Sequence, residues 1–503
     1  MAHQDRKAAW AAIHSADPAP LLDLFATEPD RVQTLGLDLA GMHFDWSKTH
    51  LEPGLIAAFE GLAKASDYVA KRDALFAGDI VNLAEHRPAT HPAERGEGSA
   101  ADNKLAADRH LRMRHLMDAI EGGAFGEIDA ILHIGIGGSA LGPELVIDAL
   151  GRDSDRVEVR VLSNIDGEAF DMAVWGLDPH TTLVVGVSKT FTTTETLTNL
   201  DAAVEWLTEH GVEDPYGRLI GVTAAPDKAV EYGIDESRVL PFSEGVGGRY
   251  SLWSSVGFSI AMAIGWGAFE ELLEGAAEMD RHVKLHDGLD NMALRAAFAD
   301  LFYTQVRKGQ SRALFAYDER LRLLPSYLQQ LEMESNGKSV TQEGTPVTHP
   351  TAPVTWGGIG TDAQHAVFQL LHQGTTAIPV EFVTVIENED SMDPRHHHLL
   401  LGNCFAQGAA LMAGRKHDDA ARSYAGNRPS TTVLLDRLDP HTLGALISFY
   451  EHRTFANATL LGINPFDQYG VDLGKEMARK LDDVAERKAF DPSTLDLIKR
   501  AGL

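Results

Sequence analysis

The feature that most constrains this 503-residue chain is a regular alternation of short β-branched runs with helical segments. Four runs, each separated from the next by a helical segment, occupy residues 129–139, 156–164, 181–190 and 217–224. Such alternation predicts a parallel sheet with helices on both faces. Three further runs, which predict a second α/β unit, occupy residues 312–317, 352–357 and 379–386.

The chain is too long for a single hydrophobic core, so more than one domain is expected. Residues 1–105 are predicted to form an N-terminal helical extension that ends in the polar stretch 91–104. The first α/β domain is expected over 106–280, and the second, with the C-terminal helices, over 281–503. Within this division the helical segment 255–305 is expected to link the two α/β units.

Charge and cysteine content exclude several classes of protein. Acidic residues outnumber basic residues by 73 to 44, and a formal net charge of −29 makes nucleic acid an unlikely partner. Cys404 is the only cysteine, which excludes an intramolecular disulfide and a Cys-rich metal site. The sequence has no apolar signal segment at its start and no run long enough to span a membrane. We therefore expect a cytoplasmic protein with no membrane contact.

A glycine-rich segment over 134–144 follows the first predicted strand and opens a helix, where backbone N–H groups can face an anion. Gly135, Gly137 and Ala140 also fit the G-x-G-x-x-A form of the dinucleotide-binding fingerprint. That fingerprint needs an acidic residue about 20 residues on, whereas Asp166 arrives about 30 residues on. Phosphate binding is favoured, and a dinucleotide site is the alternative.

A second anion-binding pattern covers residues 187–200, where a strand runs into a helix crowded with hydroxyl groups. The hydroxyl residues are Ser188, Thr190, Thr192, Thr193 and Thr194. Hydroxyl and backbone donors at a helix N-terminus bind a phosphate dianion, and Lys189 adds a positive charge. An ordinary helix cap needs only one such residue, so phosphate binding is preferred over capping.

Two later segments carry candidates for acid–base and electrostatic chemistry. Glycines around Arg249, in residues 245–258, allow a backbone to approach a ligand closely, although a solvated arginine on a surface turn is the alternative. Gln330 and Glu334 are four residues apart, on one face of a helix expected to end at Asn336-Gly337. A carboxylate near a helix end is a candidate general base, although most helical glutamates are merely solvated.

Histidines and a lysine in the last third of the chain are ambiguous on their own. Thr361 or Asp362 is expected to cap a helix that ends at Gly374, which places His365 in its first turn. An incidental histidine is the alternative for His365, and a solvated lysine is the alternative for Lys475. The run His396–His398 precedes an apolar helix, and a role at the helix start or on the surface is favoured over a metal site.

Six of these segments, in order along residues 130–480, together resemble the glucose-6-phosphate isomerase family. They are GIGGSALGP, SKTFTTTET, VGGRYSLWS, QLEMESNGK, GTDAQHAVFQLLHQGT and FDQYGVDLGK. The resemblance implies two sugar isomerase (SIS) domains, each a parallel sheet flanked by helices. It also implies an aldose–ketose isomerase of glycolysis and gluconeogenesis that works without metal or cofactor. In this family a homodimer supplies the ring-opening histidine from the neighbouring subunit, which here is His365.

The resemblance assigns a role to each candidate residue. The residues expected to bind the substrate phosphate are Gly138, Ser139, Ser188, Lys189, Thr190 and Thr193. The residues expected around the sugar are Glu334 as proton-shuttling base, Arg249 facing the enediolate, His365 and Lys475 as ring-opening pair, and Gln330 and Gln468 as polar contacts. Glu195 is expected to hold His365 in its working tautomer.

The sequence departs from the family pattern at two positions and leaves two rivals open. Gly358-Ile359 stands where the family more often has Glu-Pro, and Asp472 stands where it usually has Glu. Roles for Arg87 and Arg95 stay open. The rivals are an isomerase for another phosphosugar, such as mannose 6-phosphate, and a non-catalytic SIS module that regulates a partner.

Overall fold

The computed structural model describes residues 2–387, 392–482 and 486–503. The chain divides into two compact units, Met1–Pro465 and Phe466–Leu503. No helix in the described ranges is long and apolar enough to cross a membrane.

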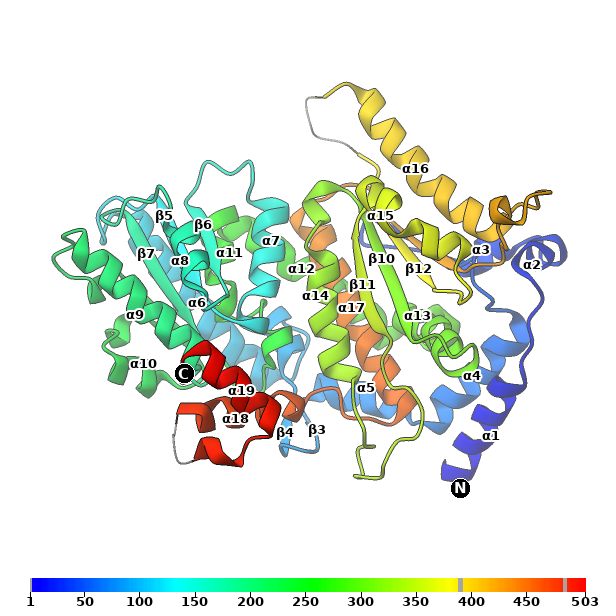
Figure 1. Cartoon of the computed structure of the whole chain (residues 1–503), viewed down its shortest axis with the longest axis horizontal. Coiled ribbons are helices and arrows are strands. Elements are labelled where there is room, and N and C mark those ends of the chain that lie inside the picture. Colours follow the sequence, from blue (N-terminus) through cyan, green and yellow to red (C-terminus); the bar gives the residue numbers. More distant parts are fainter. Residues whose placement is uncertain (1, 388–391, 483–485) are drawn as a thin grey trace. The chain divides into compact units, whose positions relative to one another are not determined.

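The first sheet has five parallel strands and carries the predicted α/β pattern (Figure 1). Its strands are β5 (Ala130–Ile134), β6 (Glu158–Leu162), β7 (Thr182–Val187), β8 (Leu219–Thr223) and β9 (Val239–Pro241). Their order across the sheet is β6-β5-β7-β8-β9. The connecting helices are α7 (Leu141–Leu150), α8 (Gly167–Val174), α9 (Thr194–Glu209) and α10 (Pro226–Tyr232). Every residue of β5, β7 and β8 is buried, as expected for central strands covered on both faces.

The second sheet has a parallel core of four strands and an antiparallel edge. Its strands are β10 (Ser311–Tyr317), β11 (Val354–Ile359), β12 (Val380–Val385), β13 (Ser430–Leu435), β1 (Gly36–Leu39) and β2 (Met42–Asp45). Their order is β1-β2-β13-β12-β10-β11. The helices that follow β11 and β12 are α15 (Gly360–Gln373) and α16 (Pro394–Ala413). Both predicted sheets are therefore confirmed, together with their parallel cores.

Helices between the two sheets are buried (Figure 1). They include α12 (Trp266–Leu285), α13 (Met292–Leu301) and α17 (Pro440–Leu461). A Cβ added at Gly275 of α12 would lie 1.8 Å from the His441 carbonyl oxygen of α17, so the two backbones touch. The segment 255–305 is thus a packed part of the core, and the expectation of a linker there is wrong.

The first 105 residues are largely helical, as expected, and also contribute strands that were not predicted. Their helices are α1 (Ala2–Ser15), α2 (Leu21–Thr27), α3 (Arg31–Leu35), α4 (Pro53–Ala65), α5 (Tyr68–Ala77) and the start of α6 (Ala100–Glu121). Strands β1 and β2 form a hairpin whose turn residues, Ala40 and Gly41, both have positive φ. That hairpin pairs with β13 and closes one edge of the second sheet. A separate small hairpin joins β3 (Ile80–Asn82) to β4 (Arg87–Pro88).

The remaining elements complete each compact unit. The first unit also contains α11 (Phe258–Ile264) and α14 (Leu324–Leu328). A π-helical turn over Gln329–Glu334 follows α14 directly. The second unit contains α18 (Asp472–Asp482) and α19 (Pro492–Ala501).

Candidate active site

The topology of the first sheet creates a natural place for a ligand. The chain leaves β5 toward β6 on one side and returns to β7 on the other side, so the strand order reverses at β5. Loops that follow neighbouring parallel strands at such a point flank a crevice where ligands bind. The glycine-rich loop follows β5, and the hydroxyl-rich loop follows β7. Both predicted phosphate-binding segments therefore lie at one edge of this sheet.

Hydroxyl groups of the loop after β7 bond to one another instead of capping α9. Thr193 occupies the N-cap position of α9 but makes no side-chain cap hydrogen bond. Its hydroxyl lies 2.9 Å from the Ser188 hydroxyl, and the Thr190 and Thr192 hydroxyls lie 2.8 Å apart. This arrangement favours anion binding over the capping alternative. In contrast, Asp166 caps α8 by accepting a hydrogen bond from the Glu168 N–H. A dinucleotide site needs an acidic residue that binds the ribose, and Asp166 is engaged in capping instead.

A buried histidine that the sequence analysis did not single out holds the glycine-rich loop. His133 of β5 lies with Nε2 2.7 Å from the Ser139 carbonyl oxygen and Nδ1 2.8 Å from the Ser259 hydroxyl. Burial lowers the pKa of His133 to about 4, so this imidazole is neutral. Only its place in an otherwise apolar strand distinguishes it in the sequence.

Lys189 ties the hydroxyl-rich loop to the segment that carries Arg249. Its ammonium group donates to the Glu244 carbonyl at 2.7 Å and to the Val246 carbonyl at 2.9 Å. Burial, followed by the nearby Arg87 guanidinium, lowers the pKa of Lys189 to about 8. Lys189 therefore gives up its proton more readily than an ordinary lysine, and it also holds the loop that contains Glu244 and Val246.

The glycine-rich loop and the Arg249 segment approach each other closely through their backbones. A Cβ added at Gly138 would lie 2.2 Å from the Gly248 carbonyl carbon and 2.5 Å from the Arg249 nitrogen. Gly137 has a φ of 55°, and a Cβ added there would lie 3.0 Å from the Gln330 amide nitrogen. Glycine at these positions lets two loops and the Gln330 helix meet at one point.

Arg249, Glu334 and Gln330 form a hydrogen-bonded cluster beside this meeting point. Arg249 is buried, with 1% of its side chain exposed, and donates to the Glu334 carboxylate at 3.0 Å. It also donates to the Ser335 hydroxyl at 2.6 Å and to the Pro465 carbonyl. Gln330 donates to the other Glu334 oxygen at 2.8 Å, while 19% of the Glu334 side chain stays exposed. Gln330 and Glu334 lie on one face of the turn, as predicted, and a fixed cation faces an accessible carboxylate.

The turn that carries Glu334 is π-helical and not α-helical. It covers Gln329–Glu334, and the helix then ends before Gly337, close to the predicted end. Turns of this kind are rare and occur frequently at functional sites. Ser335, which links Arg249 to Tyr250 through its hydroxyl, was not predicted.

His365 lies apart from this cluster in the described chain. It is exposed on α15 and lines an open pocket with His372, Gln407 and Tyr424. The helix begins at Gly360 without a side-chain cap, so the predicted cap at Thr361 or Asp362 is wrong. His365 therefore falls in the second turn and not the first. Within the described part of one chain, no hydrogen bond or ion pair joins His365 to Glu195 or Glu334.

The two remaining candidates belong to the second compact unit. Lys475 lies in α18 and Gln468 precedes it, and both are exposed there.

Comparison with known proteins gives the family. A profile of the family Phosphoglucose isomerase matches residues 45–498. The chain belongs to the phosphoglucose isomerase family. It is 62% identical to a glucose-6-phosphate isomerase from Rhizorhabdus wittichii over 497 residues, which covers 99% of each chain. It is 55% identical to that of Zymomonas mobilis over 494 residues, 98% and 97% of the two chains. A crystal structure of a glucose-6-phosphate isomerase from Chlamydia trachomatis has a TM-score of 0.88 at 28% identity, covering 98% and 97%.

For this phosphoglucose isomerase family member, the structure indicates what the two open arginines do. Arg95 is fully buried, pairs with Asp280 at 2.8 Å and Glu451 at 2.5 Å, and lies over the Trp253 ring. It is a structural residue. Arg87 pairs with Glu85 and lies near Lys189, at the rim of the phosphate loops.

The histidine run and the family departures belong to other elements than the turn that carries Glu334. His396–His398 lie within α16, near its start, and do not precede it; the helix is capped by Asp393, which accepts from the Arg395 N–H. Gly358-Ile359 ends β11, and Asp472 begins α18. Among the residues with described positions, no group of three or more His, Cys, Asp or Glu is arranged to hold a metal ion.

Proposed function

We propose that the chain interconverts glucose 6-phosphate and fructose 6-phosphate, a reaction of glycolysis and gluconeogenesis. The observation that carries this proposal is the Arg249–Glu334–Gln330 cluster placed directly against the glycine-rich loop. A phosphate held at the loops leaves the other end of a six-carbon sugar to reach a carboxylate and a fixed cation. That pair is what an aldose–ketose isomerase requires.

Phosphate recognition is assigned to the two loops at the edge of the first sheet. Ser188, Thr190 and Thr193 offer hydroxyls in front of the N-terminus of α9, where the helix dipole favours an anion. Gly138 and Ser139 offer backbone groups from the loop after β5. Lys189 contributes positive charge. This combination offsets the repulsion that a net charge of −29 exerts on a dianionic substrate.

Proton transfer is assigned to Glu334. The carboxylate removes the proton from C2 of the open-chain aldose, and the C1 carbonyl becomes the oxyanion of a cis-enediolate. Glu334 then returns the proton to C1, while the O2 hydroxyl gives up its proton and O1 takes one up, which leaves a hydroxyl at C1 and a carbonyl at C2. Arg249 stabilises the negative charge of the enediolate, since a guanidinium keeps its proton at every working pH. Gln330 holds the carboxylate between the two carbons.

Ring opening and assembly rest on the family resemblance. His365 and Lys475 open the pyranose, Gln468 contacts the sugar, and Glu195 orients His365. Because His365 is exposed and makes no contact with Glu334 in one described chain, we assign it to the site of a neighbouring subunit in a homodimer. We expect this dimer in the cytoplasm, without nucleic acid, metal or cofactor. We also keep the expected division into SIS domains over 106–280 and 281–503.

Two rival functions remain distinguishable. A non-catalytic phosphosugar-binding module needs the loops after β5 and β7 but has no need of a carboxylate held between Arg249 and Gln330. An isomerase of another phosphosugar, such as mannose 6-phosphate, would use the same groups. The second rival differs only in substrate.

A coupled assay of fructose 6-phosphate conversion to glucose 6-phosphate tests the proposal, with mannose 6-phosphate and a chelator as parallel arms. Glu334→Gln removes only the proton shuttle, so turnover is expected to fall by orders of magnitude while phosphosugar binding persists. Retention of more than about a tenth of wild-type turnover, a loss under about 1.4 kcal/mol, would show that Glu334 is not the base. Loss of activity with a chelator would contradict the metal-free route.

A further inference from the structure

The π-helical turn that carries Glu334 also presents a buried carboxylate on its opposite side. Gln330 and Glu334 bond to each other on the side that faces the glycine-rich loop. Glu332 lies midway between them in sequence, which directs it to the other side of the turn. It is buried, whereas Glu334 is partly exposed. One turn thus holds two carboxylates in opposite surroundings.

Glu332 is held by donors from three separate elements. Arg312 of β10 and Thr355 of β11 both donate to Oε2, the threonine at 2.6 Å. Arg453 of α17 donates to Oε1. Burial alone would raise the pKa of Glu332, but Arg312 and Arg453 lower it to about 2, so the carboxylate stays charged. The turn is therefore anchored both to the second sheet, through Arg312 and Thr355, and to α17, through Arg453.

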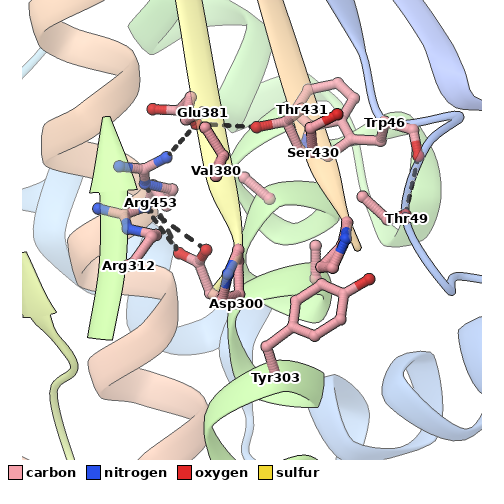
Figure 2. Close-up of a pocket in the computed structure, with 14 residues that line it drawn as sticks. Trp46, Thr49, Asp300, Tyr303, Arg312, Val380, Glu381, Ser430, Thr431 and Arg453 are labelled. Carbon is pink, nitrogen blue, oxygen red and sulfur yellow. Dashed lines mark hydrogen bonds and ion pairs between the residues drawn. The ribbon is translucent and has the colours of Figure 1, made fainter. Parts of the chain in front are cut away.

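The same arginines continue into a buried ion network (Figure 2). Arg453 donates to Glu381 at 2.7 Å, and Arg312 contacts both oxygens of Asp300 at 3.4 Å. The network contains three carboxylates, counting Glu332, and two guanidinium groups. Removing one partner of a buried pair leaves an uncompensated charge, so the loss of any one member is expected to cost stability.

A small cavity beside these arginines is too small for a metabolite. The cavity has a volume of about 20 Å³, which is enough for one water molecule. The Nε groups of Arg312 and Arg453 and the Ser430 hydroxyl, all buried and lining it, have no protein hydrogen-bond partner in the described chain. We read the cavity as part of a rigid framework and not as a ligand site.

We infer that Glu332 is a positioning residue, which holds the π-helical turn so that Glu334 stays aligned with both C1 and C2 of the sugar. This inference rests on the proposed role of Glu334 as base. A base that serves two adjacent carbons needs accurate placement, and a misplacement of about 1 Å costs about 100-fold in rate. Arg249 and Gln330 fix the carboxylate end, and Glu332 fixes the backbone that carries it.

Weakening this anchor has a consequence that a loss of stability alone does not produce. A proton held by a well-placed Glu334 passes from C2 to C1, whereas a loosened carboxylate exchanges it with water first. When glucose 6-phosphate is converted in D2O, the deuterium found at C1 of the fructose 6-phosphate product at low conversion measures the exchanged fraction, which is the fraction of turnovers in which the proton exchanged with water. This fraction does not depend on how much enzyme is folded.

Three variants separate positioning from folding. Glu332→Gln removes the charge at the anchor, and Thr355→Val removes only one hydrogen bond to it. Glu381→Gln is the matched control, because it removes the other carboxylate bound by Arg453 without touching the turn. We expect Glu332→Gln to lower kcat about 10- to 100-fold with KM changed less than about threefold, and Thr355→Val to lower kcat about threefold. Both should raise the exchanged fraction, and the control should not.

The outcomes distinguish this inference from the proposed function. If Glu334→Gln is inactive while both anchor variants give the exchanged fraction of the control, Glu332 has a structural role only and the inference is overturned. If Glu332→Gln fails to fold, Thr355→Val alone tests the inference: an exchanged fraction above that of the control supports it, and an equal fraction overturns it. If Glu334→Gln keeps its turnover, the base assignment itself fails, whatever the anchor variants do.

Discussion

At the scale of single residues, the two candidate cations of the site differ in how firmly each is held. Arg249 is buried and donates to the side chains of Glu334 and Ser335 and to the Pro465 carbonyl. Lys189 donates to two backbone carbonyls among the described residues, and its pKa is lowered to about 8. A guanidinium held in one orientation suits the stabilisation of a negative charge that develops only in the transition state. An ammonium group with a lowered pKa loses its charge at mildly alkaline pH, so substrate binding that uses it depends on pH.

Arg249→Lys tests the first of these roles. The substitution keeps a positive charge but loses the fork that bonds Glu334 and Ser335 together. We expect kcat to fall at least about tenfold, or about 1.4 kcal/mol, with a smaller rise in KM, because the lost stabilisation belongs chiefly to the transition state. Steady-state kinetics in the coupled assay measures both constants. A change confined to KM would assign Arg249 to ground-state binding instead.

Lys189 predicts a pH dependence. As pH rises through about 8, Lys189 loses its proton in the folded protein, and the phosphate loops lose a positive charge. We expect KM for the phosphosugar to rise about tenfold between pH 7 and pH 9.5, since a charge-assisted contact contributes about 1.4 kcal/mol or more. Lys189→Arg keeps its charge over this range and is expected to lack the rise. The same rise in both proteins would point to a different titrating group.

Motifs in the sequence identified the residues of the Arg249 cluster but not those that hold it in place. The four-residue spacing placed Glu334 and Gln330 on one helix face, and the family resemblance gave them their expected roles. Ser335, His133 and Glu332 were not predicted, since their roles come from partners far away in the chain, such as Arg453 for Glu332. A buried polar residue looks like any other polar residue until its partners are known.

At the scale of elements, the sequence predicted central strands best. Strands such as β5 and β7 are buried on both faces and appear as continuous apolar runs. Strand β13 and the β1–β2 hairpin were missed because they lie toward one edge of their sheet, where mixed exposure breaks the apolar run. The π-helical turn was also invisible, because its residues fit an ordinary helix.

The crossing of α12 and α17 gives a prediction about stability. A Cβ at Gly275 would lie 1.8 Å from the His441 carbonyl oxygen, so Gly275→Ala forces two buried helices apart. We expect a loss of at least about 1–3 kcal/mol and a lower melting temperature in thermal unfolding. Gly267→Ala lies in the same helix with no atom within 4 Å of the added Cβ, and alanine favours helix there. Equal melting temperatures for the two variants would contradict a close crossing.

At the scale of the whole molecule, the first compact unit contains both sheets, so Glu334 and the loops after β5 and β7 belong to one body. Glu334 is linked to the second sheet through its helix, while the glycine-rich loop belongs to the first sheet. His365, in contrast, is exposed on α15. A single chain therefore presents His365 on its surface with no bond to the Glu334 cluster in the described part of the chain, as expected if a second copy uses it.

Two inactive variants test that arrangement. In the proposed homodimer, each site takes Glu334 from one chain and His365 from the other. A mixed dimer of Glu334→Gln and His365→Ala chains then contains one site with both lesions and one site with neither. Random pairing of equal amounts makes about half of the dimers mixed, so about a quarter of wild-type activity should return. Co-expression of the two variants followed by the coupled isomerase assay measures this recovery, and separately expressed proteins mixed without subunit exchange are the control. If both groups came from one chain, every site would keep a lesion, and activity would stay at the average of the two parents.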